Sequence, residues 1–471
     1  MAEPRKDRGD TAFSIAAGVL ALVPRLYVAI AWAREPVWDG HYYDFGAKRI
    51  AAGLGYSDDV VTPLGLVWHP WCHYPVGYSG FLGFVYSVFG SGPHVATIAN
   101  ALVGGLTAVV VHRLARLAMS PARARIAAVL VALSPGLIVY SALLMTEPLA
   151  GFLLVAAAWL SARDRETHPL RGAAVGGAVL GLATLVRPQT LLVAPLLGLL
   201  VFAPTFAGEH FWARARRAFS AATLASVCAL GVVLPWTARN CAVMDGCALV
   251  STNGGWNLAI GAFPRATGRF ETLRSTDGCK VVTGQVQQDR CWWNKGVTWI
   301  KEDPSRWFSL MPKKLGFTFD HESFPIGYLA EADPASWPEE RRALGRSVLT
   351  VSYLLLLSVA ALGVVARPGR KSLWAFGPLT LVVGLALWGA EGDTHVFWPL
   401  AVLIPLLWLL PIPKAPKRDG VFAFLVLSIA SVVVTHAVFF GEDRYHMVLT
   451  PVLALLAAGA LRPAAEGGEK A

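Results

Sequence analysis

The feature that most constrains this chain is a series of long apolar stretches that carry almost no charge. A bilayer core about 30 Å thick is crossed by about 20 apolar residues in a helix. We predict about twelve membrane-spanning helices on this basis, near Ala12–Ala33, Val95–Leu114, Ile126–Tyr140, Pro148–Leu160, Ala173–Val186, Leu191–Phe206, Ala218–Trp236, Val348–Ala366, Leu373–Gly389, Val396–Leu410, Val421–Phe440 and Met447–Leu461. The shorter run Phe81–Phe89 favours an interfacial or re-entrant helix. The expected fold is an all-α polytopic membrane protein.

The basic residues of the chain lie mainly between these stretches. Although the net charge is +10, only 15% of the residues are charged. A nucleic-acid-binding protein needs a dense cationic face, so nucleic acid is excluded as a partner. The basic segments fall on the side of the N-terminus and comprise the tail with Arg5, Lys6 and Arg8, and the loops Arg113–Arg125, Arg163–Arg171, Arg214–Arg217, Arg367–Lys371 and Lys414–Arg418. Because cytoplasmic loops are rich in Lys and Arg, both termini are predicted to be cytoplasmic.

Two long segments are then predicted to lie outside the membrane. The first covers residues 34–94, and the second, residues 237–345, is long enough for a small folded lobe. The predicted division is an N-terminal transmembrane module (1–236), the external lobe (237–345) and a C-terminal transmembrane module (346–471). Each remaining external turn is short yet carries a charge, which is costly near a membrane and is usually retained for function.

The six cysteines agree with this topology. Cys228 is expected to be a buried apolar residue of a span. The others are external, where an oxidising compartment favours disulfides. We expect the pairs Cys241/Cys247 and Cys279/Cys291, although four cysteines permit three connectivities. Cys72 would then remain unpaired.

The first external segment opens with a carboxylate at the membrane surface. Asp39 follows the first span directly and is surrounded by aromatic residues. Partial desolvation could bring the pKa of such a group into the range of a general base. The alternative is a loop aspartate that caps the following helix. His41 and Tyr43 lie beside it and are candidate substrate-binding residues.

A second candidate centre lies near the end of the same segment. His69 and His73 are four residues apart with Cys72 between them, and these residue types ligate divalent metals. The two histidines share a face only on a helix, which the neighbouring prolines disfavour. His73 is a candidate metal ligand. The alternative is that this stretch is an aromatic loop at the level of the lipid headgroups, where Trp, Tyr and His are favoured.

Further charged residues are predicted at the same external depth. Glu147 begins a helix, where it either caps the helix or faces the site beside Asp39. Arg187, Arg239 and Arg444 end or begin predicted spans. They either snorkel or bind an anionic headgroup, because guanidinium matches phosphate geometry. Tyr445 follows Arg444 and is a further candidate for substrate binding.

The motifs that carry these residues resemble a known family in their order along the chain. They are Asp39…Tyr43…Ala47…Gly53-Leu54-Gly55-Tyr56, Tyr74-Pro75-Val76-Gly77-Tyr78, Thr146-Glu147-Pro148, Leu185-Val186-Arg187-Pro188, Leu234-Pro235-Trp236 with Arg239-Asn240, Ser251-Thr252-Asn253-Gly254-Gly255 with Asn257 and Gly261, and Asp443-Arg444-Tyr445. Together they resemble bacterial polytopic glycosyltransferases of the GT-C type, which are similar to protein O-mannosyltransferases and aminoarabinose transferases. The resemblance covers nearly the whole chain.

The resemblance implies an inverting transfer of a sugar from a polyprenyl-phosphate donor to an acceptor hydroxyl at the periplasmic face of the inner membrane. Asp39 would be the catalytic base, with Glu147 as a second acid, and Arg187 and Arg444 would bind phosphate. The acidic metal ligand of some relatives would fall near His73, which is not an acid. Relatives often have two adjacent acids where this chain has Asp39 and Gly40. The acceptor, whether glycan, lipid or protein, is not specified.

The alternative function is a flippase or transporter of lipid-linked sugars. Such a protein is expected to show internal repeats and charges near the membrane midplane. The charges here gather at the external edge, which favours chemistry at that edge. The sequence has no Walker loop or dinucleotide-binding motif, so a nucleotide-driven mechanism is not expected.

Overall fold

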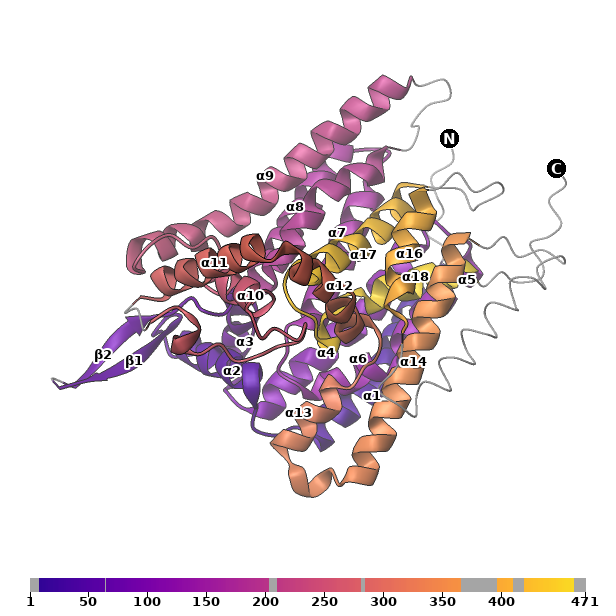
Figure 1. The fold of residues 1–471 in the computed structure, drawn as a ribbon. Coiled ribbons are helices and arrows are strands. Elements are labelled where there is room, and N and C mark those ends of the chain that lie inside the picture. Colours follow the sequence, from indigo (N-terminus) through magenta and orange to yellow (C-terminus); the bar gives the residue numbers. More distant parts are fainter. Residues whose placement is uncertain are drawn as a thin grey trace, which may run out of the picture.

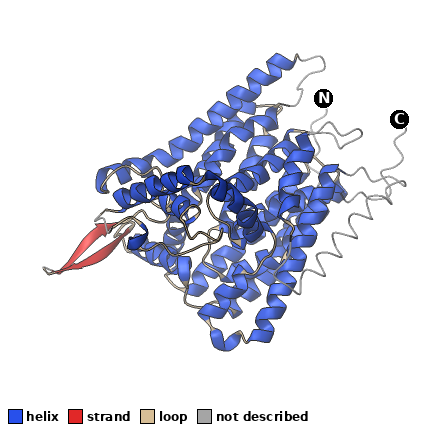
Figure 2. Cartoon of the chain, viewed as in Figure 1, coloured by secondary structure: helices blue, strands red, loops and turns tan. Residues whose placement is uncertain are grey.

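The computed structural model describes residues 8–63, 65–202, 210–280, 284–365, 396–409 and 419–460. Helices make up nearly all of this structure, and a single two-stranded sheet projects from it (Figure 2). The predicted span Leu373–Gly389 and the whole predicted external turn that follows it, Gly389–His395, lie outside the described residues, as do the basic loops Arg367–Lys371 and Lys414–Arg418.

Six helices of the described residues are long and apolar enough to cross a membrane. They are α1 (Arg8–Ala31), α4 (Pro93–Ala115), α8 (Pro169–Val186), α9 (Phe211–Val243), α14 (Glu339–Val365) and α17 (Gly420–Val438). In Figure 1, α9 runs along the upper edge of the bundle. It continues past Trp236, so the predicted domain boundary falls within a helix.

A seventh span is formed by two helices with a bend between them. α5 (Pro121–Ala132) and α6 (Pro135–Val139), the latter extended by η1 (Tyr140–Ala142), meet at 49°. Pro135 explains the break, because the residue before a proline is disfavoured in a helix.

Four of the remaining predicted spans are shorter than a full crossing in the structure. They correspond to α7 (Glu147–Arg163), the 3-10 helix η2 (Pro188–Val201), α16 (Trp398–Leu409), and η5 (Asp443–Leu449) with α18 (Thr450–Ala460). The α-helix expected at Leu191–Phe206 is this 3-10 helix, and Pro195 within it lacks the N–H that an α-helical turn requires. The structure therefore supports a multi-pass protein, and the count of twelve spans stays a prediction.

The surface of α1 is consistent with contact to lipid. Ile15, Val19, Val23, Tyr27 and Ile30 are each more than half exposed. Their spacing of three or four residues places them on one face of the helix. Exposed apolar stripes of this length are unfavourable in water, and a bilayer provides the apolar surroundings that they require.

The opposite face of α1 carries a charge that holds the bent span. Arg25 is fully buried and donates to the carbonyl oxygens of Ala21, Val131 and Ala132 at 2.7–2.8 Å. Two of these carbonyls belong to the last turn of α5, which has no further helical partners for them. Arg25 therefore has a structural role and lies apart from the external charges.

The first of the two segments predicted to be external, residues 34–94, contains both helices and strands. α2 (Trp38–Ala51) packs on α3 (Val76–Phe89), and between them β1 (Ser57–Thr62) pairs antiparallel with β2 (Gly65–Pro70). The hairpin projects at the left of Figure 1. The expectation of an all-α protein is wrong at this point, because β-branched residues flank a turn where Gly65 has φ +114°. α3 is too short to span, as predicted.

The second segment predicted to be external, residues 237–345, is mainly helical. Its elements are α10 (Gly254–Ile260), η3 (Ser275–Asp277), α11 (Gln285–Glu302), α12 (Pro304–Phe319), α13 (Phe324–Ala332) and η4 (Pro334–Ser336). A small separate core joins Phe263 and Trp292 of this segment to Phe440 and Tyr445 from the end of the chain. The segment is thus packed against the turn before α18.

The cysteines pair as predicted. The structure contains the disulfides Cys241–Cys247 and Cys279–Cys291. Cys72 is free and buried. Cys228 is also free, but it is only partly buried, so its interpretation as a buried core residue is wrong.

Candidate active site

Asp39 lies in the first turn of α2 and is held by two side chains from distant parts of the chain. Its Oδ1 accepts a hydrogen bond from the Tyr74 hydroxyl at 2.8 Å. Its Oδ2 forms an ion pair with Arg444 at 2.5 Å. Asp39 is partly exposed, with 22% of its side-chain surface accessible, so its carboxylate can be reached from outside.

The surroundings keep Asp39 ionised at neutral pH. Burial raises the pKa of the carboxyl, but the Arg444 charge and the hydrogen bonds from Arg444 and Tyr74 outweigh burial and leave the pKa below its usual value. An ionised carboxylate is the form that a general base requires.

A second ion pair lies at the start of α7. Glu147 Oε1 is 2.6 Å from Arg187 Nη1, and the same nitrogen is 3.1 Å from the Thr146 hydroxyl. With its amide oxygen facing the guanidinium, Gln189 accepts hydrogen bonds from Arg187 Nε at 2.9 Å and from Arg187 Nη2 at 3.1 Å. The Glu147 side chain is fully buried, and its Oε2 has no hydrogen-bond partner within the described chain.

The ring of Tyr445 lies between the two ion pairs. The guanidinium carbons of Arg187 and Arg444 are 5.0 and 5.1 Å from the centre of this ring. The ring also stacks on His436, with centroids 4.2 Å apart. We call Asp39, Glu147, Arg187, Arg444 and Tyr445 the double ion-pair cluster; the structure brings these five predicted site residues together.

The two predicted substrate-binding residues beside Asp39 differ in their positions. Tyr43 is buried, and its ring contacts those of Tyr74 and Tyr78, each at 5.5 Å. Burial and the Asp39 charge raise the pKa of the Tyr43 phenol. His41 is exposed, and its ring contact is with Tyr42. Tyr43 thus supports the cluster from the inside, whereas His41 faces outward.

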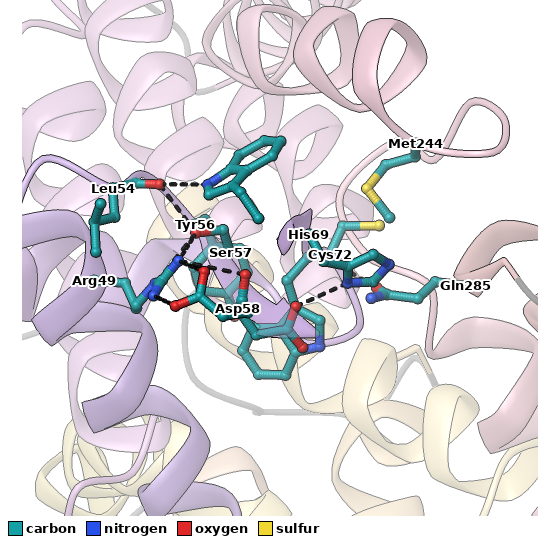
Figure 3. A network of polar contacts seen from close by, with 12 residues as sticks. Arg49, Leu54, Tyr56, Ser57, Asp58, His69, Cys72, Met244 and Gln285 are labelled. Carbon is teal, nitrogen blue, oxygen red and sulfur yellow. Dashed lines mark hydrogen bonds and ion pairs between the residues drawn. The ribbon is translucent and has the colours of Figure 1, made fainter. Parts of the chain in front are cut away.

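Arg239 is placed away from the cluster. Its guanidinium donates to the carbonyl oxygens of Trp71 and Tyr56 at 3.0 and 2.7 Å and lies over the Trp236 ring at 4.7 Å. It therefore ties the base of the hairpin to α9. Figure 3 shows the neighbouring contacts, in which Arg49 binds Ser57 and the backbone N–H of Cys72 donates to Gln285.

The candidate metal ligands are separated by the end of a strand. His69 lies on β2 and contacts Asp58 at 2.8 Å (Figure 3). His73 follows that strand and contacts the rings of Tyr74 and Trp256. The two histidines therefore do not share a helix. In the part of the chain that the structure describes, no group of three or more His, Cys, Asp or Glu residues could hold a metal ion.

Three further residues complete the site and were not predicted. Tyr74 donates to Asp39, Glu442 pairs with Arg444 Nε at 2.8 Å, and the Phe324 ring lies 5.0 Å from the Arg444 guanidinium carbon. Tyr74 and Glu442 lie within or beside the motifs already noted. Phe324 comes from the second external segment, and no local pattern marks it.

Comparison with known proteins is consistent with this architecture. The fold is similar to that of an archaeal oligosaccharyltransferase. The family model of dolichyl-phosphate-mannose-protein mannosyltransferases matches residues 73–238. A search of curated proteins found no match.

Two solved structures illustrate the likeness. The apo oligosaccharyltransferase of Archaeoglobus fulgidus matches with a TM-score of 0.50 and 14% identity, over 97% of this chain and 50% of that one. ArnT from Cupriavidus metallidurans, solved with undecaprenyl phosphate, matches with a TM-score of 0.36 and 18% identity, over 96% of this chain and 78% of that one. The chain thus spans about half the length of the archaeal enzyme.

Proposed function

We propose that the protein is an inverting glycosyltransferase that moves a sugar from a polyprenyl-phosphate donor to an acceptor hydroxyl at the external face of a bacterial inner membrane. The observation that carries the proposal is the double ion-pair cluster, which places two acids and two arginines around one aromatic ring. The matching family is named for a dolichyl-phosphate sugar donor, and this name supports a lipid-linked donor here.

Asp39 acts as the general base. It accepts the proton of the acceptor hydroxyl while that oxygen forms a bond to the anomeric carbon of the donor sugar. The bond between the anomeric carbon and the phosphate oxygen breaks, and the polyprenyl phosphate leaves with the bonding electrons. Because attack comes from the face opposite the leaving group, the anomeric configuration inverts.

Arg444 links donor binding to the activation of Asp39. Without donor, its charge lowers the basicity of Asp39 through the 2.5 Å ion pair. Guanidinium binds phosphate and carboxylate with similar geometry, so an arriving donor phosphate competes with Asp39 for Arg444. Transfer of Arg444 to the phosphate leaves Asp39 with its hydrogen bond from Tyr74, and makes Asp39 a stronger base only when donor is present.

Arg187 and Glu147 act on the donor. Arg187, together with Arg444, stabilises the negative charge that develops on the leaving phosphate, so no general acid is needed. Glu147 holds Arg187 through one oxygen. Its other oxygen accepts from a hydroxyl of the donor sugar.

The proposed topology follows the basic loops, with both termini in the cytoplasm and the cluster facing the periplasm. The partners are the lipid-linked donor, membrane lipids and a glycan, lipid or protein acceptor. His41, exposed beside Asp39, contacts the acceptor, and Tyr43 supports the base from behind. No step requires a metal ion, and His73 remains the candidate ligand should a divalent ion bind.

The test uses the full chain in sealed proteoliposomes with a panel of radiolabelled polyprenyl-phosphate sugars and heat-treated membrane extract as the acceptor source. With the wild type, we expect the labelled sugar of one donor to be transferred to an acceptor. We expect Asp39→Asn to bind that donor but to transfer no sugar. Asp59→Asn is the matched control, because Asp59 of the hairpin also pairs with an arginine, Arg49 of α2, but lies outside the cluster. Equal activity of Asp39→Asn and wild type would contradict the base assignment. Movement of donor across the membrane with no product would favour the transporter alternative.

A further inference from the structure

The backbone immediately before Asp39 has an unfavourable conformation. Trp38 has a φ of +50°, and within the described ranges it is the one residue other than glycine with a positive φ. A bulky residue rarely adopts this conformation, and such residues persist only where their surroundings hold them. Some part of the structure must therefore hold the first turn of α2.

The side chains that hold this turn come from α13. The rings of Phe324 and Tyr328 contact the Trp38 ring, with centroids 5.5 and 5.9 Å away. The Tyr328 hydroxyl accepts a hydrogen bond from the backbone N–H of Val37 at 3.3 Å. The Trp38 ring thus contacts two rings of α13, and the backbone N–H of the residue before it is bound by a hydroxyl of the same helix.

Gly40 permits this close approach. A Cβ atom at position 40 would lie 2.3 Å from the Tyr328 hydroxyl oxygen and 3.1 Å from the Leu144 carbonyl oxygen. The first distance is too short for a real contact and the second is tight, so a side chain here would displace the hydroxyl. Where relatives often have a second acid, this chain therefore has the space that Tyr328 occupies.

Helix α13 also contacts Arg444, the ion-pair partner of Asp39. The Phe324 ring faces the Arg444 guanidinium. The neighbouring Asp443 accepts hydrogen bonds from the backbone N–H groups of Ser323 and of Phe324, the latter at 2.7 Å. Asp443 thus caps the start of α13, which fixes the helix to the turn that carries Arg444.

From these contacts we infer that α13 acts as a clamp, in which Tyr328 and Phe324 position Asp39 against Arg444. Tyr328 is a positioning residue that acts through the backbone of α2 and does not touch the reacting atoms. The inference rests on the proposed function for its kinetic readout. It also gives the second external segment a defined role at the site.

The first experiment removes a single hydroxyl. Tyr328→Phe keeps the ring and loses the hydrogen bond to Val37. Because small displacements of a catalytic group reduce rates strongly, we expect kcat to fall on the order of 10-fold, with the KM for the donor unchanged. The matched control is Tyr86→Phe. It removes a buried hydroxyl of α3 that is bonded at 2.6 Å to Asp44 of α2, the helix that also carries Asp39. If both variants lose activity in the same proportion, Tyr328 is only a packing residue and the clamp is refuted.

The second experiment tests the contact with Gly40. We expect Gly40→Ala to reduce kcat at least as strongly as Tyr328→Phe. In the Tyr328→Phe background the added methyl no longer meets the hydroxyl oxygen. Only the longer contacts with the Leu144 carbonyl oxygen at 3.1 Å and with ring atom Cε2 of residue 328 at 3.2 Å remain, so we expect less than about a threefold further loss. Losses that multiply independently would refute the inference.

A stability measurement separates the clamp from the proposed function. The free energy of unfolding is measured without substrate for four proteins: wild type, Asp39→Asn, Tyr328→Phe and the double variant. Together these values give the coupling energy between the two residues. A coupling clearly different from zero supports the clamp even if no donor is turned over, in which case only the proposed function fails. Additive effects refute the clamp even if the enzyme is active.

Discussion

Replacement of Arg187 by methionine removes the ion-pair partner of a fully buried carboxylate, that of Glu147. Glu147 has no exposed side-chain surface, and Arg187 is only 11% exposed. Within the described residues, Glu147 receives its hydrogen bond from Arg187 alone. Removing one partner of a buried ion pair costs about 3–5 kcal/mol, since the remaining charge is left uncompensated. Methionine retains much of the volume, so this cost is mainly electrostatic.

The double-mutant cycle isolates that electrostatic cost. Glu147→Gln with Arg187→Met leaves a neutral amide in place of the charge, and an unsatisfied neutral group costs about 1–3 kcal/mol. We therefore expect the double variant to be about 2 kcal/mol more stable than Arg187→Met alone. The assay is denaturant unfolding in mixed micelles, followed by tryptophan fluorescence.

A surface pair supplies the control for this cycle. Glu339 and Arg346 are 2.5 Å apart but are 63% and 42% exposed, so their cycle should show much weaker coupling. If Arg187→Met and the double variant were equally unstable, the Glu147 carboxylate would not depend on Arg187. The reasoning about this pair would then be wrong.

Three other outcomes are expected. Although burial raises the pKa of Asp39, its pair with Arg444 leaves the folded-state pKa below the unfolded value of about 3.9. The stability difference between wild type and Asp39→Asn should therefore be constant from about pH 5 to 8 and shrink below about pH 4; a decline between pH 5 and 7 would contradict the sign. Gly77→Ala should lower the unfolding temperature, because its Cβ would lie 2.5 Å from the backbone just before Arg187, whereas Gly80→Ala on the same helix meets nothing within 4 Å and should be neutral or slightly stabilising. Alkylation of the denatured, unreduced protein should label two thiols, and reducing each disulfide should cost about 2–3 kcal/mol from its loop length; labelling of four or six would exclude the pairing.

Several charged residues that the sequence marks as candidates lie together in the structure, although their roles stay predictions. Asp39, Glu147, Arg187 and Arg444 were identifiable because charge at the edge of an apolar stretch is costly and therefore informative. Arg239 carries the same signal, yet its donors are bound to backbone carbonyls. A residue type at a given depth does not reveal whether its hydrogen bonds are already satisfied within the fold.

Other features depend on contacts that no local pattern encodes. Span positions followed from apolar runs, but the break before Pro135 and the 3-10 helix around Pro195 depend on backbone hydrogen bonding rather than on hydropathy. The hairpin could not be predicted from hydropathy, because its short strands are largely exposed and show no alternation of apolar and polar residues. The strained Trp38 is explained only by α13, almost three hundred residues later in the chain.

The distance along the chain between the members of the Asp39–Arg444 pair also has a consequence in time. They are separated by 405 positions, so during synthesis at about 5–20 residues per second, Asp39 emerges roughly 20–80 s before its partner. Throughout that interval the carboxylate has no guanidinium to neutralise it. A nascent or truncated chain that ends before Arg444 therefore lacks one partner of this ion pair, and η5, just before the last described helix, supplies that partner.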